Sequence, residues 1–327
     1  MGTQLDQKIP KGNRDPMSYL TEPNPNSIFL EPVLNEEMLI HINSLRDCAS
    51  GYDGVPSSLF KYGTNYLLEP IVHIINLSIS TGVVPTKCKM ANVIPLYKTA
   101  GKESVNNYRP ISLLTTISQF GFRENHATYM AMLSMLEGII EANEKNYFTI
   151  GIYLDYSKAF DTVNHVILLK KLEYYGIRGI ALKWFENYLK NRTQFTTYNS
   201  TISSTTNITC GVPQGSILGP LLFIIYVNDM CLASPIMRLL LFADDTNGFL
   251  SGPDLDLLEL TVNTELNKLN EWIISNRLSL NVEKTQFMLF KPRKKMKVKI
   301  ISINIGGKII NEVKSCKFLG HNGKKSC

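Results

Sequence analysis

Acidic residues follow short apolar stretches of the sequence, and this arrangement restricts how those stretches can fold. Asp155 comes directly after the run Ile150 to Leu154, and Asp244 and Asp245 separate two further apolar runs. The first run has strand character, and the other two predict a β-hairpin with the two acids at its tip. A carboxylate at the end of a buried strand needs compensation, because an unpaired buried charge is costly.

Three carboxylates at strand ends on one sheet would repel one another unless a cation lay between them. Magnesium meets this requirement, since it takes carboxylate oxygens and keeps coordination positions for water and phosphate. Two such ions about 3.5–4 Å apart can hold the attacking and leaving oxygens of a phosphoryl transfer. The alternative is structural: Asp155 caps the turn that follows it, and Asp244 and Asp245 are ordinary turn residues.

Hydrophobic periodicity predicts an α+β chain in which short strands are interleaved with helices. Such an order favours a sheet with helices on one face. Residues 1–27 are rich in Pro and Asn and predict an irregular leader. Helices are predicted over 28–50, 56–81, 162–190 with a break at Gly176 to Gly179, 217–231 and 254–276, and strands over 90–97, 149–154, 195–210, 238–243 and 246–250.

Positive charge is concentrated in the last part of the sequence. The chain has 34 Lys and Arg against 28 Asp and Glu, a net charge of +6. Residues 284–327 hold twelve of the bases and one acid, which gives +11 and leaves −5 for residues 1–283. A nucleic acid or another polyanion would be attracted to this segment. A solvated, Lys-rich strand pair or a frayed end accounts for the same residues, and Lys291 to Lys297 is either a nuclear localisation signal or a solvated connection.

The sequence argues against a membrane-spanning, secreted or zinc-binding protein. Its longest apolar run, Ile217 to Val227, is shorter than the roughly 20 residues of a membrane span, and no signal-peptide core follows Met1. The six cysteines include no C-x-x-C pair and the five histidines are scattered, so neither a disulfide framework nor a zinc module is expected. We expect an intracellular protein, nuclear or cytoplasmic, with no membrane association and no disulfide-linked partner.

Six short motifs are spread along the chain in a definite order. They are NYRPISL at 107–113, QFGFR at 119–123, LDYSKAFD at 154–161, GVPQGS at 211–216, FADD at 242–245 and NVEKT at 281–285. In this order they resemble the successive motifs of reverse transcriptases from non-LTR (LINE-type, jockey-like) retrotransposons. The likeness extends from about Ile28 to Gly320.

The resemblance implies a right-hand polymerase fold of the α+β class. Its palm would be an antiparallel sheet with helices on one face, joined to a reduced fingers subdomain. The implied order is an irregular leader at 1–27, partial fingers at 28–124, a palm with catalytic motifs at 125–290, and a basic segment at 291–327 with a primer-grip-like hairpin and the start of a thumb.

The resemblance also implies RNA-directed DNA polymerase activity, in which deoxynucleotides are added to a primer 3′-hydroxyl by two-metal phosphoryl transfer. Asp155, Asp244 and Asp245 match the catalytic, metal-binding carboxylates. Tyr156 would contribute to nucleotide binding, with its backbone carbonyl as a further metal ligand. Two Mg²⁺ ions are implied, with Mn²⁺ as the alternative. The implied partners are an RNA template, a DNA primer or target DNA, and deoxynucleoside triphosphates.

Further residues match positions that bind the nucleotide. Arg109 resembles the arginine that grips the triphosphate, and its guanidinium fork suits phosphate oxygens. Phe160 falls at the aromatic steric gate against the ribose 2′-hydroxyl, and a core residue at a helix start is the alternative. Gln214 and Gly215 would line the nucleotide pocket, and a plain helix N-terminus is the alternative. Lys284 matches a lysine that protonates or neutralises the pyrophosphate, and a solvated lysine is the alternative.

Three basic residues match positions that contact nucleic acid. Arg123 is assigned to the template. Lys314 and Lys317 lie in the segment Val313 to Gly320, which resembles the primer-gripping hairpin, and there they would follow a phosphate backbone.

The sequence departs from the family pattern in ways that affect activity. Because Ser118 runs directly into Gln119, we expect the helical connector that normally follows NYRPISL to be missing, and from the pattern of the family we expect residues 1–327 to hold only the start of a thumb. Because a small misplacement of reacting groups can cost about 10²-fold in rate, we expect weak activity from this chain alone. The alternatives are a non-catalytic, nucleic-acid-binding remnant of a retrotransposon and a decaying element that does not fold stably.

Overall fold

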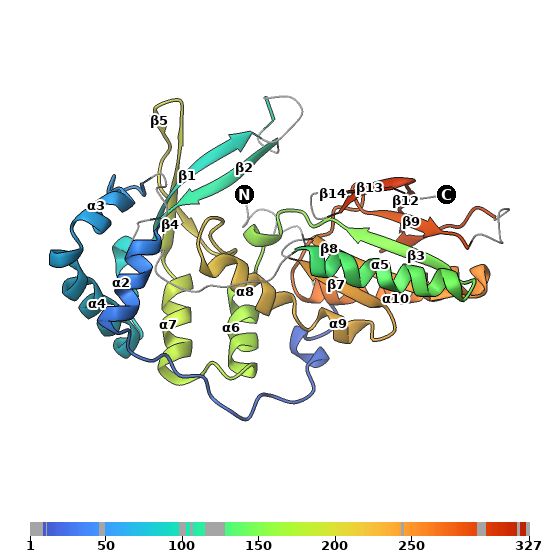
Figure 1. Cartoon of the computed structure of the whole chain (residues 1–327), viewed down its shortest axis with the longest axis horizontal. Coiled ribbons are helices and arrows are strands. Elements are labelled where there is room, and N and C mark those ends of the chain that lie inside the picture. Colours follow the sequence, from blue (N-terminus) through green and yellow to red (C-terminus); the bar gives the residue numbers. More distant parts are fainter. Residues whose placement is uncertain are drawn as a thin grey trace. The chain divides into compact units, whose positions relative to one another are not determined.

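The computed structural model describes residues 9–10, 12–45, 50–97, 103–104, 107–114, 128–242, 245–292, 299–318 and 321–324. Side chains are described for these residues except 128–134, 242, 316–318 and 321–324. The described residues form two compact units that alternate along the chain (Figure 1). The first unit lies within Glu22–Arg123 and Val163–Tyr226, and the second lies within Gln4–Thr21, Glu124–Thr162 and Val227–Cys327.

The second unit is built on a sheet with β3 (Phe148–Leu154) at its centre. This strand pairs antiparallel with β8 (Asp245–Gly252) on one side and with β9 (Gln286–Phe290) on the other. Beyond β8 lies β7 (Arg238–Phe242), also antiparallel, while β12 (Asn311–Glu312) pairs parallel with β9. The strand and hairpin predicted around the acids are therefore confirmed, and β12 makes the sheet mixed rather than purely antiparallel.

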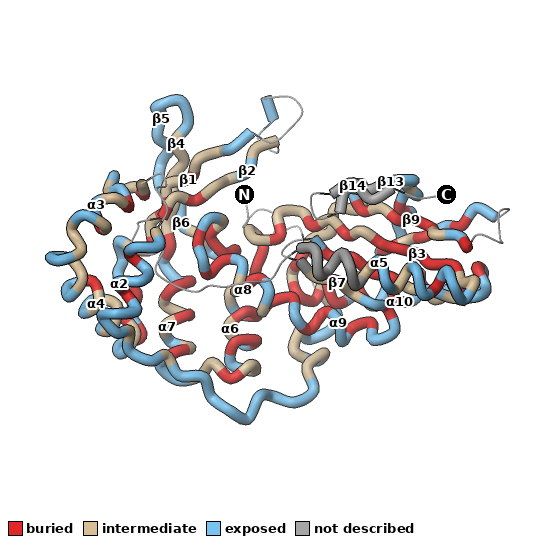
Figure 2. Tube along the Cα trace, viewed as in Figure 1, coloured by how far each residue is buried: buried red, intermediate tan, exposed pale blue. Residues whose placement is uncertain are grey.

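Helices pack on this sheet through apolar side chains at helical spacing. α5 (Thr128–Glu144) contacts β3, β7 and β8, and α10 (Leu255–Ser275) contacts β3 and β8. Asp254 caps the start of α10, because its carboxylate accepts the Leu257 N–H at 2.8 Å. The helix predicted over 254–276 is therefore confirmed. Its buried residues include Leu258, Val262, Leu266, Leu269, Trp272 and Ile273. Figure 2 shows the buried, red stretch of β3 in the same unit.

The first unit contains its own sheet. In it, β1 (Met90–Tyr97) pairs antiparallel with β2 (Tyr108–Leu113) and parallel with β4 (Arg192–Tyr198). The short strands β5 (Thr201–Ile202) and β6 (Thr206–Ile208) both pair with β4. The strand prediction for 90–97 is confirmed, and the segment predicted as strand over 195–210 divides into three strands.

Two prolines face each other across β1 and β2. The register pairs Pro95 with Pro110, and neither residue has a backbone N–H. This pair must therefore occupy a non-hydrogen-bonded position of the antiparallel ladder, where no inter-strand bond is lost. On its other side, β1 pairs with β4 only from Met90 to Val93, so that ladder ends before Pro95.

Helices complete the first unit. Met38 and Ile42 form a core with Phe60 and Ile71, from three successive helices. The helix predicted over 28–50 is shorter than expected, since Pro32 disfavours helical backbone at the residue before it. Among the described residues, no helix is both long and apolar enough to cross a lipid bilayer. The helices are α2 (Asn35–Ser44), α3 (Ser57–Tyr62), α4 (Thr64–Thr81), α6 (His165–Tyr174), α7 (Gly179–Leu189) and α8 (Leu218–Val227).

Trp272 is the largest fully buried side chain of the described residues. It lies on the buried face of α10, and its indole N–H donates to Asp229 Oδ2 at 3.1 Å. Asp229 is buried as well, and it directly precedes α9 (Met230–Ala233). Because a buried carboxylate requires hydrogen bonds, this contact fixes α10 to the segment that leads into α9.

We expect Trp272→Phe to lower the free energy of unfolding by about 2–4 kcal/mol, since it leaves a cavity and removes a donor from a buried carboxylate. Trp184→Phe is the matched control. The indole N–H of Trp184 donates to Ser78 Oγ at 2.9 Å, but this side chain is only partly buried and water can replace the lost donor. Urea unfolding followed by circular dichroism measures both variants, and equal losses would contradict the assignment.

Candidate active site

Asp155 and Asp245 lie at the same end of neighbouring strands. Leu154, the last residue of β3, is paired with Thr246 of β8. Asp155 directly follows Leu154 and Asp245 directly precedes Thr246, so the antiparallel register places the two acids beside each other. Asp155 is half-buried and Asp245 is exposed. The third predicted acid, Asp244, lies outside the described residues.

The backbone of Asp155 is held by a segment more than a hundred residues away in the sequence. The Asn281 N–H donates to the Asp155 carbonyl at 2.7 Å, and the Ser157 N–H donates to the Ser279 carbonyl at 2.7 Å. The Asp155 N–H in turn donates to Thr285 Oγ1 at 3.3 Å. Both backbone groups of Asp155 are therefore fixed by residues 281–285, the NVEKT motif.

Thr285 closes the turn that carries these contacts. Its side chain is fully buried, and its hydroxyl donates to the Asn281 carbonyl at 3.0 Å. The backbone N–H groups of Lys284 and Thr285 donate to the same carbonyl at 3.1 and 2.9 Å. The sequence analysis assigned a role only to Lys284 in this motif and missed Asn281 and Thr285. The sequence carried no signal for them, because the burial of Thr285 and the strand that follows it are seen only in the structure.

The side chain of Tyr156, which directly follows Asp155, is part of the core. Its side chain is buried, and the hydroxyl donates to Met230 Sδ at 3.3 Å. Burial raises the pKa of the Tyr156 hydroxyl to about 12. Tyr156 bridges to Leu280, and the hydrogen bonds of this bridge are made by Asp155 and Ser157, so the bridge does not use the Tyr156 carbonyl.

Phe160 lies in the loop that follows Asp155. It belongs to the short 3₁₀ helix η5 (Ala159–Asp161), which begins after Lys158 at a φ of 54°. Its side chain is half-buried. The alternative for this position, a core residue at a helix start, is compatible with this placement as well.

Arg109, Gln214 and Gly215 belong to the first unit. Arg109 is exposed on β2, opposite Leu96. The Gln214 carbonyl accepts the Ser112 N–H at 2.7 Å. Gly215 has a φ of +107°, and a Cβ atom there would lie 2.6 Å from the Ser112 carbonyl oxygen. Gly215 therefore lets the GVPQGS motif approach β2 closely. This contact joins it to the NYRPISL motif, which forms β2.

The GVPQGS motif is also anchored at its beginning and its end. The Gly211 N–H donates to the Val163 carbonyl at 2.7 Å, and the Gly211 carbonyl lies 2.7 Å from His165 Nε2. A carbonyl only accepts, so Nε2 carries the proton, and burial lowers the pKa of His165. At the other end, Ser216 Oγ accepts the Gly219 N–H at 2.8 Å. The sequence analysis missed His165, because a single His gives no pattern.

The basic residues differ in their surroundings. Lys284 and Lys314 are exposed, and Lys317 lies in β13 (Ser315–Phe318), which forms a hairpin with β14 (His321–Lys324). The side chain of Lys317 and the whole of Arg123 lie outside what the structure describes. Lys299 forms ion pairs with Asp256 and Glu259 of α10. These acids raise its pKa and compensate one charge of the basic segment.

The donor set at the end of β3 suits a hard divalent cation. Two carboxylates, from Asp155 and Asp245, lie at one edge of the sheet, with the Tyr156 carbonyl between β3 and the following loop, and Mg²⁺ prefers such oxygen donors. Within the described ranges, which leave out Asp244, no group of three or more His, Cys, Asp or Glu side chains is placed to share a metal ion.

Comparisons with known proteins agree with the motif analysis. Residues 97–322 match the family model described as reverse transcriptase (RNA-dependent DNA polymerase). The chain is 26% identical to the RNA-directed DNA polymerase from mobile element jockey of Drosophila melanogaster, over 97% of this chain and 38% of that protein. It is 27% identical to the probable RNA-directed DNA polymerase from transposon BS of the same organism, over 94% of this chain and 37% of that protein.

The chain spans less than two fifths of the length of these curated relatives. The two alignments extend over 356 and 347 residues, which is more than the 327 residues of the chain. The relatives therefore contain residues inside the aligned region that have no counterpart here. The junction between Ser118 and Gln119, where the sequence analysis expects the missing connector, lies outside the described residues.

We expect Thr285→Val to lower the free energy of unfolding by about 1–3 kcal/mol, because the N–H of the half-buried Asp155 loses its acceptor and the Asn281 carbonyl loses a donor at a fully buried side chain. Thr264→Val is the matched control. The Thr264 hydroxyl donates to the Leu260 carbonyl at 2.9 Å on the exposed side of α10, and its removal should change stability by less than about 0.5 kcal/mol. Urea unfolding measures both, and similar values would speak against the role of Thr285.

The raised pKa of Tyr156 predicts how stability depends on alkaline pH. Below about pH 10, Tyr156 is protonated in both the folded and the unfolded chain. Between pH 10 and about 12, only the unfolded chain releases the proton, so stability falls as pH rises. Tyr156→Phe should remove this part of the loss, while Tyr62→Phe, at an exposed tyrosine, should not. Urea unfolding at pH 8 to 11 tests the difference, and parallel curves for both variants would refute it.

Proposed function

Since the chain belongs to the reverse transcriptase (RNA-dependent DNA polymerase) family, we propose that it adds deoxynucleotides to a primer 3′-hydroxyl as directed by an RNA template. The observation that carries this proposal is the pair Asp155 and Asp245, placed by the β3–β8 register at one edge of the sheet. Carboxylates at adjacent strand ends provide the anionic oxygens that a two-metal phosphoryl transfer requires. The proposed partners are RNA, a DNA primer or target DNA, and deoxynucleoside triphosphates.

We propose that Asp155, Asp244 and Asp245 hold two Mg²⁺ ions, with the Tyr156 carbonyl as a further ligand and Mn²⁺ as a substitute. Bound there, the ions would offset the repulsion between the acids and the substrate phosphates and polarise the reacting oxygens. The chain's own contribution is positional. Asp155 is fixed through both its backbone groups by Asn281 and Thr285, which limits how far its carboxylate can move.

For the nucleotide, we propose that Arg109 binds the triphosphate and that Gln214 and Gly215 line its pocket. The exposure of Arg109 on β2 supports this role, because its guanidinium can reach a ligand from there. Phe160 would exclude a ribose 2′-hydroxyl with the accessible part of its ring. Lys284, exposed in the turn after Asn281, would protonate or neutralise the leaving pyrophosphate.

For the nucleic acid, we propose that Lys314 and Lys317 follow a phosphate backbone and that Arg123 contacts the template. The β13–β14 hairpin supports the resemblance to a primer grip. The proposed domain order remains leader, fingers, palm and basic segment, with boundaries at 27, 124 and 290. Residues 163–226 group with the first unit, so the proposed palm contributes to both units. We propose a nuclear or cytoplasmic location for a chain with this function.

Primer extension on an RNA template, with Mg²⁺ and deoxynucleotides, tests the proposal. We expect Asp155→Asn to reduce incorporation by more than about 100-fold, since loss of even an outer partner of a metal ligand costs about 10–100-fold. Asp244→Asn should do the same. Glu283→Gln is the charge-matched control, because Glu283 is an exposed acid of the neighbouring turn, and its activity should stay within about twofold of the unchanged chain.

The result that would overturn the proposal is a folded chain that extends no primer. Salt-dependent RNA binding that survives Asp155→Asn, without any extension product, would instead favour a non-catalytic nucleic-acid-binding remnant. A cooperative thermal melt of the same sample establishes that the chain is folded.

A further inference from the structure

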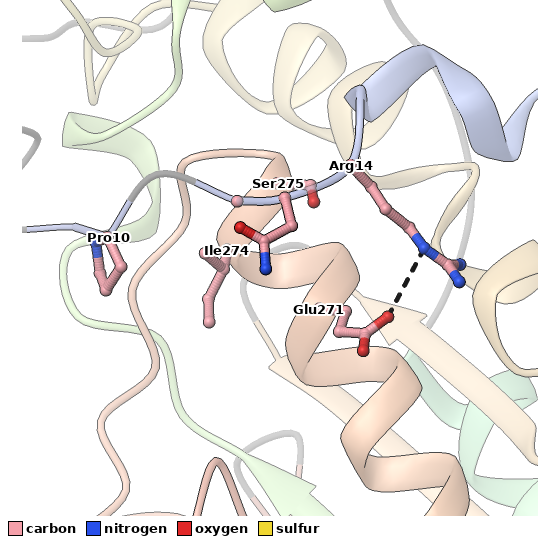
Figure 3. A pocket seen from close by; sticks show the side chains of 7 residues that line it. Pro10, Arg14, Glu271, Ile274 and Ser275 are labelled. Carbon is pink, nitrogen blue, oxygen red and sulfur yellow. Dashed lines mark ion pairs between the residues drawn. The ribbon is translucent and has the colours of Figure 1, made fainter.

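An N-terminal segment of the second unit lies across the C-terminal end of α10 (Figure 3). We call residues 9–10 and 12–19 the strap. It includes the short 3₁₀ helix η1 (Pro16–Tyr19), which Asp15 caps by accepting the Met17 N–H at 3.0 Å. A cavity of about 220 Å³ remains between part of the strap and α10. Beside this cavity, the strap contacts the end of α10 at several points, and Ile9 is buried.

Gly12 and Arg277 provide the closest of these contacts. A Cβ atom at Gly12 would lie 2.6 Å from the Ser275 Cα, so only glycine lets the strap approach the last turn of α10. Arg277 Nη1 donates to the carbonyls of Ile9 and Pro10 at 2.9 and 3.1 Å. A third contact, the ion pair from Arg14 Nε to Glu271 Oε2 at 3.7 Å, lies between exposed side chains and contributes little.

Arg277 stands where helices usually place glycine. Its φ is +54°, and its N–H donates to the Ile274 carbonyl while the Leu278 N–H donates to the Ile273 carbonyl, both at 2.9 Å. These bonds form a Schellman motif, whose left-handed position favours glycine. An arginine in this conformation strains the backbone. The two hydrogen bonds from its side chain to the strap carbonyls offset that strain.

The chain leads from Arg277 directly to the residues that hold Asp155. Two residues later, the Ser279 carbonyl accepts the Ser157 N–H, and the Asn281 N–H donates to the Asp155 carbonyl. Leu278, between Arg277 and Ser279, is buried, so the backbone that joins these two residues has little freedom to move. A displacement of Arg277 would therefore be passed to the segment 279–281 and from there to Asp155.

We infer that Arg277 is a positioning residue, which fixes the strap to the end of α10 and thereby sets the placement of the Asp155 carboxylate. This inference rests on the proposed function for the importance of that placement, but its structural part stands without it. The strap thus helps to hold Asp155 in place at the end of β3, although the two are more than a hundred residues apart in the sequence.

Arg277→Gly separates this role from a merely structural one. Glycine adopts the left-handed position readily, so the Schellman hydrogen bonds should be kept, while the end of α10 is no longer tied to the strap and can shift together with residues 279–281. We expect amide exchange at Ser157 and Asn281 to accelerate about tenfold or more, and the Mg²⁺ concentration for half-maximal primer extension to rise about 10–100-fold. Arg277→Lys should restore part of both effects, because an ammonium group can still donate to a carbonyl.

Two further variants complete the experiment. Gly12→Val should displace the strap from Ser275 and reproduce the faster exchange with Arg277 intact. Arg14→Ala is the control and should change both readouts by less than about twofold. Unchanged exchange at Ser157 and Asn281 in folded Arg277→Gly and Gly12→Val chains would overturn the inference. Accelerated exchange in a chain that extends no primer would uphold the positioning contact and reject the polymerase activity instead.

Discussion

Backbone pairing on both sides of β3 is the constraint on which the second unit depends. The strand is paired with β8 from Phe148 to Leu154 and with β9 from Thr149 to Tyr153. A shift of one residue against either neighbour would turn every side chain of β3 to the opposite face, and the buried Ile150 and Ile152 with them. The same register that buries these residues also brings Asp155 next to Asp245 at the start of β8. The packing of the core and the placement of the two acids therefore depend on the same strand pairing.

Local patterns account for the elements that the sequence analysis predicted correctly. β1, β3, the β7–β8 hairpin and α10 each follow from a period in the apolar residues. β9 was missed because no secondary structure was assigned to Gln286–Phe290, and residues 284–327 were weighed by their positive charge, which indicates a surface. The structure shows the opposite, since Phe287, Met288 and Leu289 are buried. α5 was also not predicted.

The contacts that join the motifs could not be predicted, because most of them use backbone groups. Any residue except proline can supply the N–H with which Asn281 binds Asp155, or with which Ser112 binds Gln214. The resemblance assigned Gln214 to the nucleotide pocket and Lys284 to the pyrophosphate, whereas the contact of Gln214 with β2 and that of Lys284 with Asn281 use backbone groups. Gly215 is the exception, because its positive φ and the 2.6 Å to the Ser112 carbonyl exclude other residues.

The proline pair in the first unit also affects association between molecules. Among the described strands of its sheet, β2 is at the edge, and an exposed edge strand can accept a strand from another chain. A residue at a non-hydrogen-bonded position directs its N–H away from the paired strand, and Pro110 has none to offer there. On the same outer side of β2, the Ser112 N–H is already bound to the Gln214 carbonyl, so neither Pro110 nor Ser112 offers a donor to an added strand. Intermolecular strand addition, and the aggregation that follows from it, is hindered at this edge without any cost to the β1–β2 ladder.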